Sequence, residues 1–322
     1  MLILSLTACS EERTTASFQA MDTLMTLTVY GGEGGLCDRL QERISALSKQ
    51  LDATDGDSEI AKLNREKTAA LGEEPAELLR SSLGFCEKLG GSFDITVYPA
   101  VQAWGFISGE HRVPEDAELQ ALSERIDYRR VGSDGAVFTL PEDTEIDLGA
   151  VAKGYAADIC DQVLRDGNAQ AAVLNLGGTI KLYGKKPDGS RFKVGVADPE
   201  NPAGYFGYLM TDAAVVATSG GYERYFEKDG RRYIHILDPK TAKTVDNGVL
   251  SVTIVTDNGA YADALSTALF VMGLDDAVAY YEKNRDFDFI ILTDSGDLYI
   301  TEGVYSDFSL GGDYDFTLHK IS

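Results

Sequence analysis

The most informative stretch of the chain reads Ile146-Asp147-Leu148-Gly149-Ala150-Val151-Ala152-Lys153-Gly154-Tyr155. Its pattern indicates the end of a strand that runs into a helix with no loop between them. The backbone N–H groups at such a helix start are free to face an anion. Lys153 lies in the first turn, where a cation opposes the helix dipole, and a bound phosphate would explain that placement. The alternative is a solvated surface lysine.

The segments on either side of this stretch predict the fold class. Apolar residues recur at helical spacing in 151–164, and strand-like segments dominate 171–255. Further helices are expected at 36–51, 58–63, 75–89, 114–122, 260–272 and 274–283. Helices and strands mix without a regular βαβ alternation, and no linker or internal repeat divides the chain. We therefore expect an α+β fold in which residues 18–322 form one domain.

Shorter patterns predict additional strands. Alternating apolar residues indicate one strand at 18–30, and two brief strands are expected at 128–131 and 137–140. Residues 289–292 and 298–301 are expected to close the chain as a hairpin across the turn at 294–297.

The composition limits the classes of function. The chain has 322 residues, of which 44% are hydrophobic and 25% charged, and its net charge is −23. Nucleic acid is therefore not an expected partner, because phosphate backbones are bound by Lys and Arg. A polyphosphate ligand would need a local device such as a helix start, a metal ion or one well-placed lysine. Of the four cysteines, Cys37, Cys86 and Cys160 are expected to be reduced core residues.

The first nine residues form a short apolar run that ends in Leu6-Thr7-Ala8-Cys9, as in a bacterial lipobox. A polar stretch follows, so residues 1–17 are expected to be a signal remnant and tether, although no positively charged segment precedes them. A lipid on Cys9 would anchor the protein to the outer face of a membrane without a transmembrane helix. The alternative is an apolar N-terminus without a function.

Asp263 and Thr267 lie four residues apart in an expected helix, so they share one face. A carboxylate and a hydroxyl placed in this way can both reach one hard cation, and Mg²⁺ prefers such oxygen ligands. The alternative is an Asp that caps the helix and a Thr that bonds back to it. Spacing alone does not separate the two interpretations.

His235 is the histidine of interest among three, because His111 and His319 stand in polar surroundings. It lies where an expected strand meets the turn at Asp238-Pro239. A histidine at the end of a strand can act as a general base or donate to a phosphate. The alternative is a structural histidine with its hydrogen bonds satisfied.

Motifs along most of the chain, from about Phe18 to Phe308, together resemble the ApbE family, the FAD:protein FMN transferases. In chain order they are Ala20-Met21-Asp22-Thr23, Ser58-Glu59-Ile60 with Leu63-Asn64, Phe93-Asp94-Ile95-Thr96-Val97, the block from Asp147 to Asp158, Asn175-Leu176-Gly177-Gly178, Thr218-Ser219-Gly220, His235 with Asp238-Pro239, and Ala262-Asp263 with Thr267. A single motif of this kind is weak, whereas the ordered set is specific.

The resemblance implies a two-lobed α+β fold with FAD in the cleft between the lobes, in an extracytoplasmic lipoprotein of the bacterial cell membrane. The residues that it implies for FAD contact are Met21, Ser92, Phe93, Asp94, Asp147, Lys153 and Leu237. It implies Mg²⁺ ligation by the main-chain carbonyl of Ala150, by Asp263, by Thr267 and by Ser266, the last through its backbone oxygen. His235 matches a histidine proposed to assist the chemistry, and His235 and Asp263 are the candidate catalytic groups.

The reaction implied by the resemblance is the Mg²⁺-dependent transfer of FMN from FAD to a threonine hydroxyl of an acceptor protein, with release of AMP. Either His235 or Asp263 would take the threonine proton. The implied acceptors are redox-subunit or FMN-binding domains that carry the threonine in a short Ser/Thr-Gly-Ala-Thr-like motif.

One position departs from the family pattern. Many members have a tyrosine four residues before the serine that matches Ser58, stacked on the isoalloxazine, and this chain has Thr54 there. An aromatic stack contributes ~0.5–1.5 kcal/mol beyond burial. Two alternatives therefore stay open: a Mg²⁺-dependent FAD pyrophosphatase that gives FMN and AMP, and a lipoprotein that binds flavin without turnover. In a purely structural lipoprotein, the phosphate and metal motifs would be coincidence.

Overall fold

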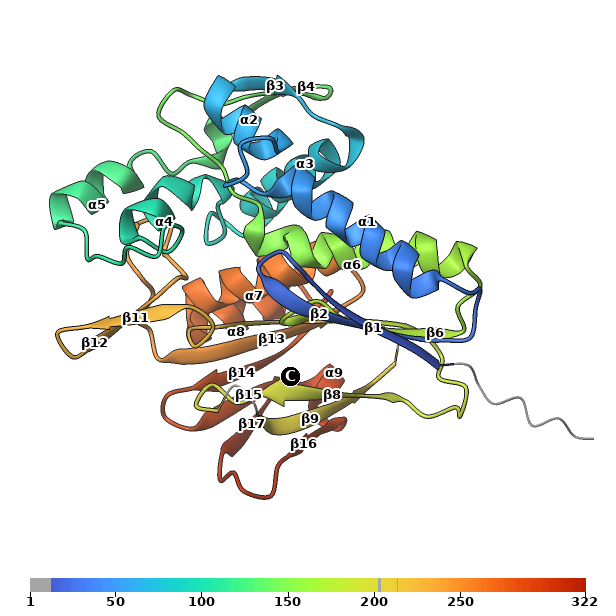
Figure 1. Ribbon diagram of the computed structural model, residues 1–322. Coiled ribbons are helices and arrows are strands. Elements are labelled where there is room, and N and C mark those ends of the chain that lie inside the picture. Colours follow the sequence, from blue (N-terminus) through green and yellow to red (C-terminus); the bar gives the residue numbers. More distant parts are fainter. Residues whose placement is uncertain (1–12, 202–203, 213) are drawn as a thin grey trace, which may run out of the picture.

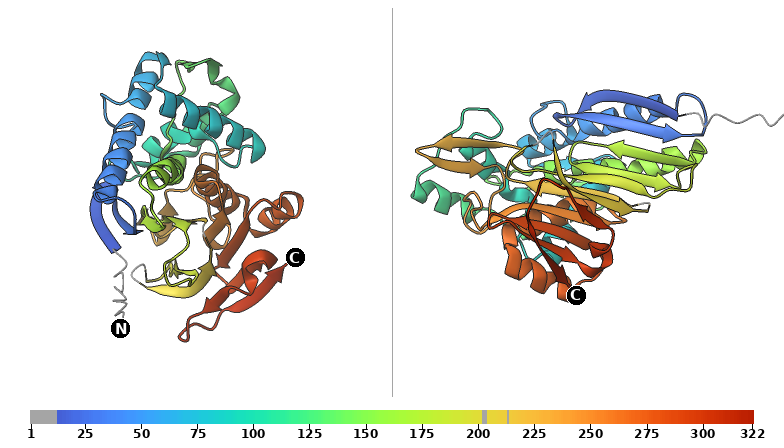
Figure 2. Two further views of the ribbon diagram at one scale, coloured as in Figure 1. Left: turned by 90° about the vertical axis from the view of Figure 1, so that its right-hand side faces the viewer. Right: turned by 90° about the horizontal axis from the view of Figure 1, so that it is seen from below.

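The computed structural model describes residues 13–201, 204–212 and 214–322. Within these ranges, nine strands form one large sheet, with most of the helices on one face and, on the other, a three-stranded sheet with the short helix Glu302–Tyr305 (Figure 1). Figure 2 shows the same layers from two further sides. This arrangement confirms the predicted α+β class.

The large sheet has the strand order β1-β2-β6-β7-β10-β13-β14-β15-β17. Its neighbouring strands are antiparallel, except that β15 and β17 are parallel. The bounds are β1 (Arg13–Ala20), β2 (Thr23–Tyr30), β6 (Ala171–Asn175), β7 (Thr179–Gly184), β10 (Val215–Gly220), β13 (Val249–Thr256), β14 (Asp288–Thr293), β15 (Asp297–Thr301) and β17 (Thr317–Ile321). Strand β13 is buried on both faces because layers cover both sides of the sheet.

The helical layer follows the periodicity of the sequence. In α1, the residues at helical spacing that face the core are Leu36, Leu40, Ile44, Leu47 and Leu51. The helices are α1 (Leu36–Leu51), α2 (Glu59–Glu66), α3 (Glu73–Lys88), α4 (Tyr98–Trp104), α5 (Asp116–Ser123), α6 (Gly149–Asp166), α7 (Gly259–Met272), α8 (Leu274–Lys283) and α9 (Glu302–Tyr305), with 3₁₀ turns at Ile95–Val97 and Tyr128–Arg130. All the predicted helices are confirmed.

Three smaller sheets complete the fold. Strands β8 (Phe192–Ala197), β9 (Tyr205–Thr211) and β16 (Phe308–Leu310) pack on the large sheet through a second apolar core. Strands β3 (Thr68–Ala70), β4 (Gly132–Asp134) and β5 (Val137–Thr139) pair near the helices, and β11 (Tyr225–Lys228) and β12 (Arg231–Ile234) form a separate hairpin. The predicted strand at 137–140 and the closing hairpin of β14 and β15 are confirmed.

Two strand predictions are wrong. The expected strand at 18–30 is a hairpin, because Met21 and Asp22 turn the chain with φ angles of 49° and 57°. Neither residue is a glycine, so the turn left no clear signal in the sequence. The expected strand at 128–131 is a 3₁₀ turn, which begins where the Asp127 carboxylate accepts a hydrogen bond from the Arg129 N–H.

Cys37, Cys86 and Cys160 are buried and free, as predicted. Residues 1–12, with Cys9, lie outside the described residues, so the lipobox stays a prediction. Residues 13–17, which were expected to belong to the tether, instead form the first part of β1 and pair with β2. No helix in the described part of the chain is both long and apolar enough to cross a membrane.

Candidate functional site

Helices α6 and α7 touch through their backbones. A Cβ atom on Gly154 would lie 1.9 Å from the Gly259 carbonyl oxygen, and a Cβ atom on Gly259 would lie 2.3 Å from the Gly154 carbonyl oxygen. The Asp158 carboxylate of α6 accepts hydrogen bonds from the Gly259 and Ala260 N–H groups at 2.8 and 3.0 Å. Asp158 of α6 therefore caps the N-terminus of α7, and this fixes the register of the two helices at the crossing.

Asp263 of α7 also forms a hydrogen bond across the crossing, to the backbone of α6. Its Oδ2 accepts from the Gly154 N–H at 2.7 Å, and its Oδ1 accepts from the Thr179 hydroxyl at 2.7 Å. Burial raises the pKa of Asp263, while the Lys153 ammonium and the two hydrogen bonds oppose that rise. A regular helix directs the Gly154 N–H toward the carbonyl of Ala150. The Ala150 carbonyl oxygen and the Asp263 carboxylate are therefore both directed at the Gly154 N–H.

The remaining predicted metal ligands lie on the next turn of α7. The Ser266 hydroxyl donates to the Asp263 carbonyl at 2.9 Å and bonds to the Ser219 hydroxyl at 2.7 Å. The Thr267 hydroxyl lies 3.4 Å from the same Ser219 oxygen. Because the Ser266 side chain is committed to these bonds, its backbone oxygen is the better candidate donor to a metal.

This donor set fits Mg²⁺ better than a transition metal. No group of three or more His, Cys, Asp or Glu side chains gathers to hold a metal within the described ranges. A cation between Asp263, the Ala150 carbonyl and Thr267 would meet one carboxylate and otherwise neutral oxygens. Mg²⁺ is commonly bound in this manner, with substrate phosphates and waters completing its coordination.

Lys153 and Glu223 face one glycine turn beside this set. The Lys153 Nζ lies 3.9 Å, and the Glu223 Oε1 3.4 Å, from the point where a Cβ atom on Gly178 would stand. Burial raises the pKa of Glu223, and the positive charge of Lys153 opposes that rise. Gly149 and Ala150, at the start of α6, are exposed. A helix start and a lysine therefore adjoin the possible metal ligands, as phosphate binding requires.

His235 directly follows β12 and is held by one carbonyl. Its backbone N–H and its Nδ1 lie 3.0 and 3.2 Å from the Arg224 oxygen. Because a carbonyl can only accept, this contact assigns the ring proton to Nδ1 and leaves the Nε2 lone pair free. Burial, with the Arg224 charge, lowers the pKa of His235 to about 4. The imidazole is thus neutral near pH 7 and able to accept a proton.

The N-terminal hairpin of β1 and β2 places Met21 near Arg224 and the Gly177-Gly178 turn. The side chain of Thr23 fills the space beside Gly177, where a Cβ atom would lie 2.3 Å from the Thr23 hydroxyl. Asp22 forms an ion pair with Arg224 at 3.5 Å. The Met21 N–H donates to the Ser48 hydroxyl at 3.3 Å. The turn that carries Met21 is therefore packed against the Gly177-Gly178 turn.

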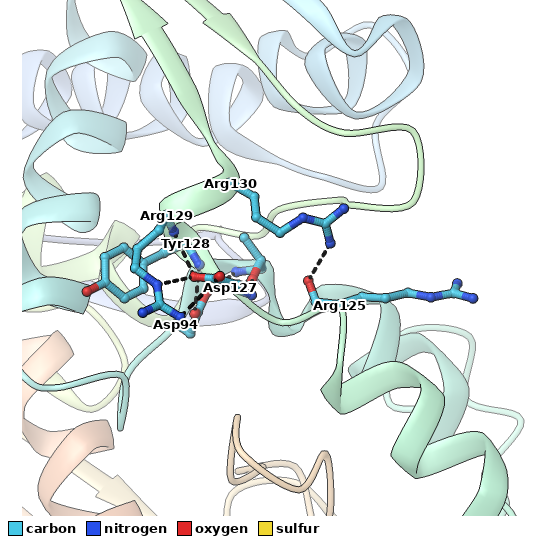
Figure 3. A network of polar contacts seen from close by, with 7 residues as sticks. Asp94, Arg125, Asp127, Tyr128, Arg129 and Arg130 are labelled. Carbon is cyan, nitrogen blue, oxygen red and sulfur yellow. Dashed lines mark hydrogen bonds and ion pairs between the residues drawn. The ribbon is translucent and has the colours of Figure 1, made fainter.

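Ser92, Phe93 and Asp94 lie in the helical layer, and all three are buried. Asp94 has a structural role: its Oδ1 accepts from the Thr96 N–H and hydroxyl at 2.8 and 2.7 Å, and its Oδ2 accepts from the Tyr128 N–H at 3.0 Å (Figure 3). The Asp147 N–H donates to the Ile95 carbonyl at 3.0 Å, which ties this segment to the start of α6. The contacts of these residues with FAD stay predictions.

Two further positions are placed as follows. Leu237 is buried in a separate apolar cluster with Trp104 and Ala242, so its side chain serves packing. Thr54 is exposed, and its hydroxyl donates to Asp52 Oδ1 at 2.6 Å. Neither observation gives a flavin contact.

The structure brings together Lys153, His235 and Asp263, and it adds Glu223 and Arg224, which the sequence analysis missed. Burial raises the pKa of Asp147, and Arg224 opposes that rise, so Asp147 belongs to the same group. The available signal was the charged pair Glu223-Arg224, which is separated from Gly220-Gly221 by Tyr222 alone. We call the set of Asp147, Lys153, Glu223, His235 and Asp263 the charged cluster.

A pocket of about 550 Å³ lies elsewhere, at the C-terminal end of α7. Its lining includes Asn247, Gly273, Asp275 and Asp294 and contains none of the predicted site residues. It is therefore separate from the charged cluster.

Comparison with known proteins identifies relatives of the whole arrangement. The profile of the ApbE family matches residues 21–291. The FAD:protein FMN transferase of Klebsiella pneumoniae (strain 342) is 30% identical over 292 residues, which cover 87% of this chain and 89% of the relative. The enzyme of the same name from Treponema pallidum (strain Nichols) is 34% identical over 277 residues, which cover 79% of this chain and 76% of the relative.

Solved structures agree with this relationship. The crystal structure of the ApbE protein from Thermotoga maritima has a TM-score of 0.85 at 31% identity and covers 91% of this chain and 98% of that protein. The apo form of the flavinyl transferase ApbE from Pseudomonas stutzeri has a TM-score of 0.79 at 26% identity, with 88% and 92% covered.

Proposed function

This chain belongs to the ApbE family, and from that premise we propose that it moves FMN from FAD to a threonine hydroxyl of an acceptor protein, with Mg²⁺ required and AMP released. The relatives are flavin transferases, and this chain is an enzyme of that class. The observation that carries the proposal is the position of Asp263. It joins α6 to α7 beside Lys153, at an exposed helix start suited to a phosphate.

Mg²⁺ would be held by Asp263, the Ala150 carbonyl, the Ser266 backbone oxygen and Thr267, and when bound it would neutralise charge on the pyrophosphate. Lys153 and the N–H groups at the start of α6 orient the phosphates. Met21, Ser92, Phe93, Asp94, Asp147 and Leu237 are the proposed contacts with the rest of FAD, between the lobes.

At the phosphorus atom, the reaction breaks one bond and forms one. The threonine Oγ attacks the phosphorus of the FMN phosphate, an Oγ–P bond forms, the P–O bond to the AMP phosphate breaks, and AMP leaves with that electron pair. The proton of the threonine hydroxyl goes to His235 Nε2. His235 is a better base than Asp263, because both oxygens of Asp263 already accept hydrogen bonds whereas Nε2 is free.

One observation favours hydrolysis as a second function. Thr54 is a small, exposed side chain at the position where many family members carry a tyrosine. A flavin that lacks this aromatic cover is open to water, and water could replace threonine as the acceptor. The products would then be free FMN and AMP.

For the location of the enzyme, we propose that a lipid on Cys9 anchors it to the outer face of the cell membrane. The support is the apolar run that ends in Leu6-Thr7-Ala8-Cys9, followed by polar residues. Labelling with radioactive palmitate, compared between the parent and Cys9→Ser, tests this anchor. Equal labelling of both proteins would show that Cys9 does not carry the lipid.

A product assay tests the function. The chain from Glu11 onward is incubated with FAD and Mg²⁺, with and without a threonine-bearing carrier domain, and AMP, free FMN and carrier mass are measured. A carrier heavier by one FMN, with AMP formed only when the carrier is present, is the expected result. AMP and free FMN without the carrier would establish the pyrophosphatase, and no AMP in either tube would leave flavin binding alone.

A further inference from the structure

The hairpin of β11 and β12 extends from the charged cluster, at the edge of the molecule beside α4 (Figure 1). Its inner face is held by stacked rings: His111 lies on Phe226 with ring centroids 4.8 Å apart, and Phe226 lies on Tyr233 at 5.1 Å. Trp104 packs on Tyr233 at 5.4 Å. A two-stranded hairpin alone is marginally stable in water, and this aromatic stack supplies the packing that it needs.

The outer edge of β11 is open. The hairpin forms a sheet of two strands, with no third strand beside it among the residues that the structure describes. The His235 N–H donates to the Arg224 carbonyl, so Arg224 and Phe226 face β12. By the alternation of an antiparallel pair, the N–H and C=O groups of Tyr225 and Glu227 point outward. Such an edge can accept an additional strand.

The side chains beside this edge are of the kinds that dominate protein interfaces. Tyr225 is 42% exposed, and the Arg232 guanidinium lies 4.2 Å from the centre of its ring. Arg232 also pairs with Glu227 at 3.2 Å, which orients both side chains. Tyrosine and arginine are enriched among the residues that contribute most to binding.

The hairpin also differs in charge from the rest of the chain. Residues 224–234 contain four basic side chains and two acidic ones, whereas the whole protein has a net charge of −23. The net negative charge therefore repels an acidic partner, and this repulsion is weakest at the hairpin. Complementary charge of this type directs encounter and orientation more than it adds affinity.

We propose that the outer edge of β11 binds the threonine-bearing segment of an acidic acceptor protein as an added strand. The proposal rests on the proposed function and specifies how the acceptor is bound. Strand β11 begins at Tyr225, directly after Arg224, whose carbonyl holds His235. A strand added along Tyr225 and Glu227 lies on the side of β11 away from His235, and its end lies beside Arg224, at the margin of the charged cluster.

A proline on the open edge tests the added strand. In Glu227→Pro, the outward N–H is lost and the ring obstructs the edge, while the bonds between β11 and β12 are kept. Glu227→Ala is the matched control, because it removes the same carboxylate but keeps the N–H. The probe is a small acidic carrier domain that displays an extended Ser-Gly-Ala-Thr segment.

The expected result is a KM for the carrier about tenfold higher in Glu227→Pro than in Glu227→Ala, which corresponds to one or two backbone hydrogen bonds. The affinity for FAD should be equal in the two variants, which also shows that both are folded. Equal KM values for the carrier would overturn the docking site. A parent enzyme that adds no FMN to the carrier would instead refute the proposed function.

Amide hydrogen exchange on the parent enzyme gives a test that does not depend on a variant. The carrier is used with its threonine replaced by valine, so that it binds without reacting. Slower exchange at Tyr225 and Glu227 in the presence of the carrier is expected, with Thr211 on β9 as an internal reference. Unchanged exchange at Tyr225 and Glu227 when the carrier is bound would refute the added strand.

Discussion

The crossing of α6 and α7 and the region around the β11–β12 hairpin both contribute to the charged cluster, but they are built differently. At the crossing, two glycines bring the backbones together, and the carboxylates of the buried Asp263 and the partly buried Asp158 bond across them. Around the hairpin, the connection is an ion pair between Arg224 and Asp22, whose side chains are 52% and 85% exposed. The first region leaves no room for adjustment, whereas the second remains open to solvent and partners.

This difference suits the two tasks of a transferase. Phosphates and a metal must be held in one geometry, because small displacements reduce the rate of a phosphoryl transfer strongly. An acceptor protein must enter and leave, and exposed ion pairs contribute only ~0–1 kcal/mol each. Substitutions at the crossing should therefore have large effects on the chemistry, and substitutions on the open side should have graded effects on substrate selection.

The largest effect is expected for Asp263→Ala. Loss of the carboxylate removes the charged ligand proposed for Mg²⁺, and Mg²⁺-dependent AMP release should fall by at least about 10³-fold. Asp275→Ala, at the exposed start of α8, is the control and should keep full activity. Full Mg²⁺-dependent activity in Asp263→Ala would remove the metal assignment.

The stability of Asp263→Asn gives a second readout. Because burial raises the pKa of Asp263, its charged form costs free energy in the folded protein. The metal-free parent should therefore lose stability as the pH rises through that raised pKa, and the variant should not. At pH 7 without Mg²⁺, the Tm of Asp263→Asn is expected to be at least as high as that of the parent.

A smaller loss is expected for His235→Gln, because removal of a general base reduces kcat by about 10²–10³-fold. The pKa of His235 is lowered to about 4, so the neutral base is present above that pH and is lost as the pH falls through it. In the parent, the pH profile of FMN transfer should have an acidic limb near 4 rather than near 6.5. His319→Gln is the control, and a limb near 6.5 would contradict the assignment.

The crossing itself is tested by Gly154→Ala. A Cβ atom there would lie 1.9 Å from a backbone oxygen, so the helices must separate, at a cost of about 1–3 kcal/mol in the free energy of unfolding. Gly84→Ala is the matched control, because Gly84 lies inside α3 and nothing stands within 4 Å of its Cβ position. That control should gain about 0.5–1 kcal/mol. Urea unfolding measures both, and equal changes would show that the crossing is not close-packed.

The two regions also differ in how well the sequence predicts them. The sequence around Lys153 and Asp263 predicted two helices, because periodic apolar residues and helix-start chemistry are local signals. Spacing did not place the two residues in one site, which only the family resemblance implied. The bond from the Gly154 N–H to Asp263 spans 109 positions and could not be read locally. Its trace in the sequence is a glycine inside a helix, which usually has a packing reason.

Around the hairpin, local signals were weaker. Asp229 and Gly230 turn the hairpin with φ angles of 53° and 76°, a recognisable Asp-Gly pair, but the Met21-Asp22 turn has no such pair and was read as continuous strand. Glu223 and Arg224 were missed because exposed charges usually have no function. Their importance comes from the positions of Lys153 and Asp22, which only the fold brings near.

The smallest effect is expected for Thr54→Tyr, at an exposed position just after α1. The parent residue is exposed, so a larger side chain can be accommodated there without disturbing the core. A ring stacked on the flavin contributes ~0.5–1.5 kcal/mol, which corresponds to about 2- to 12-fold tighter binding of FAD. It should also exclude water and reduce FMN release relative to transfer. Thr54→Leu controls for size, and if it binds FAD as tightly as Thr54→Tyr, burial rather than stacking accounts for the gain.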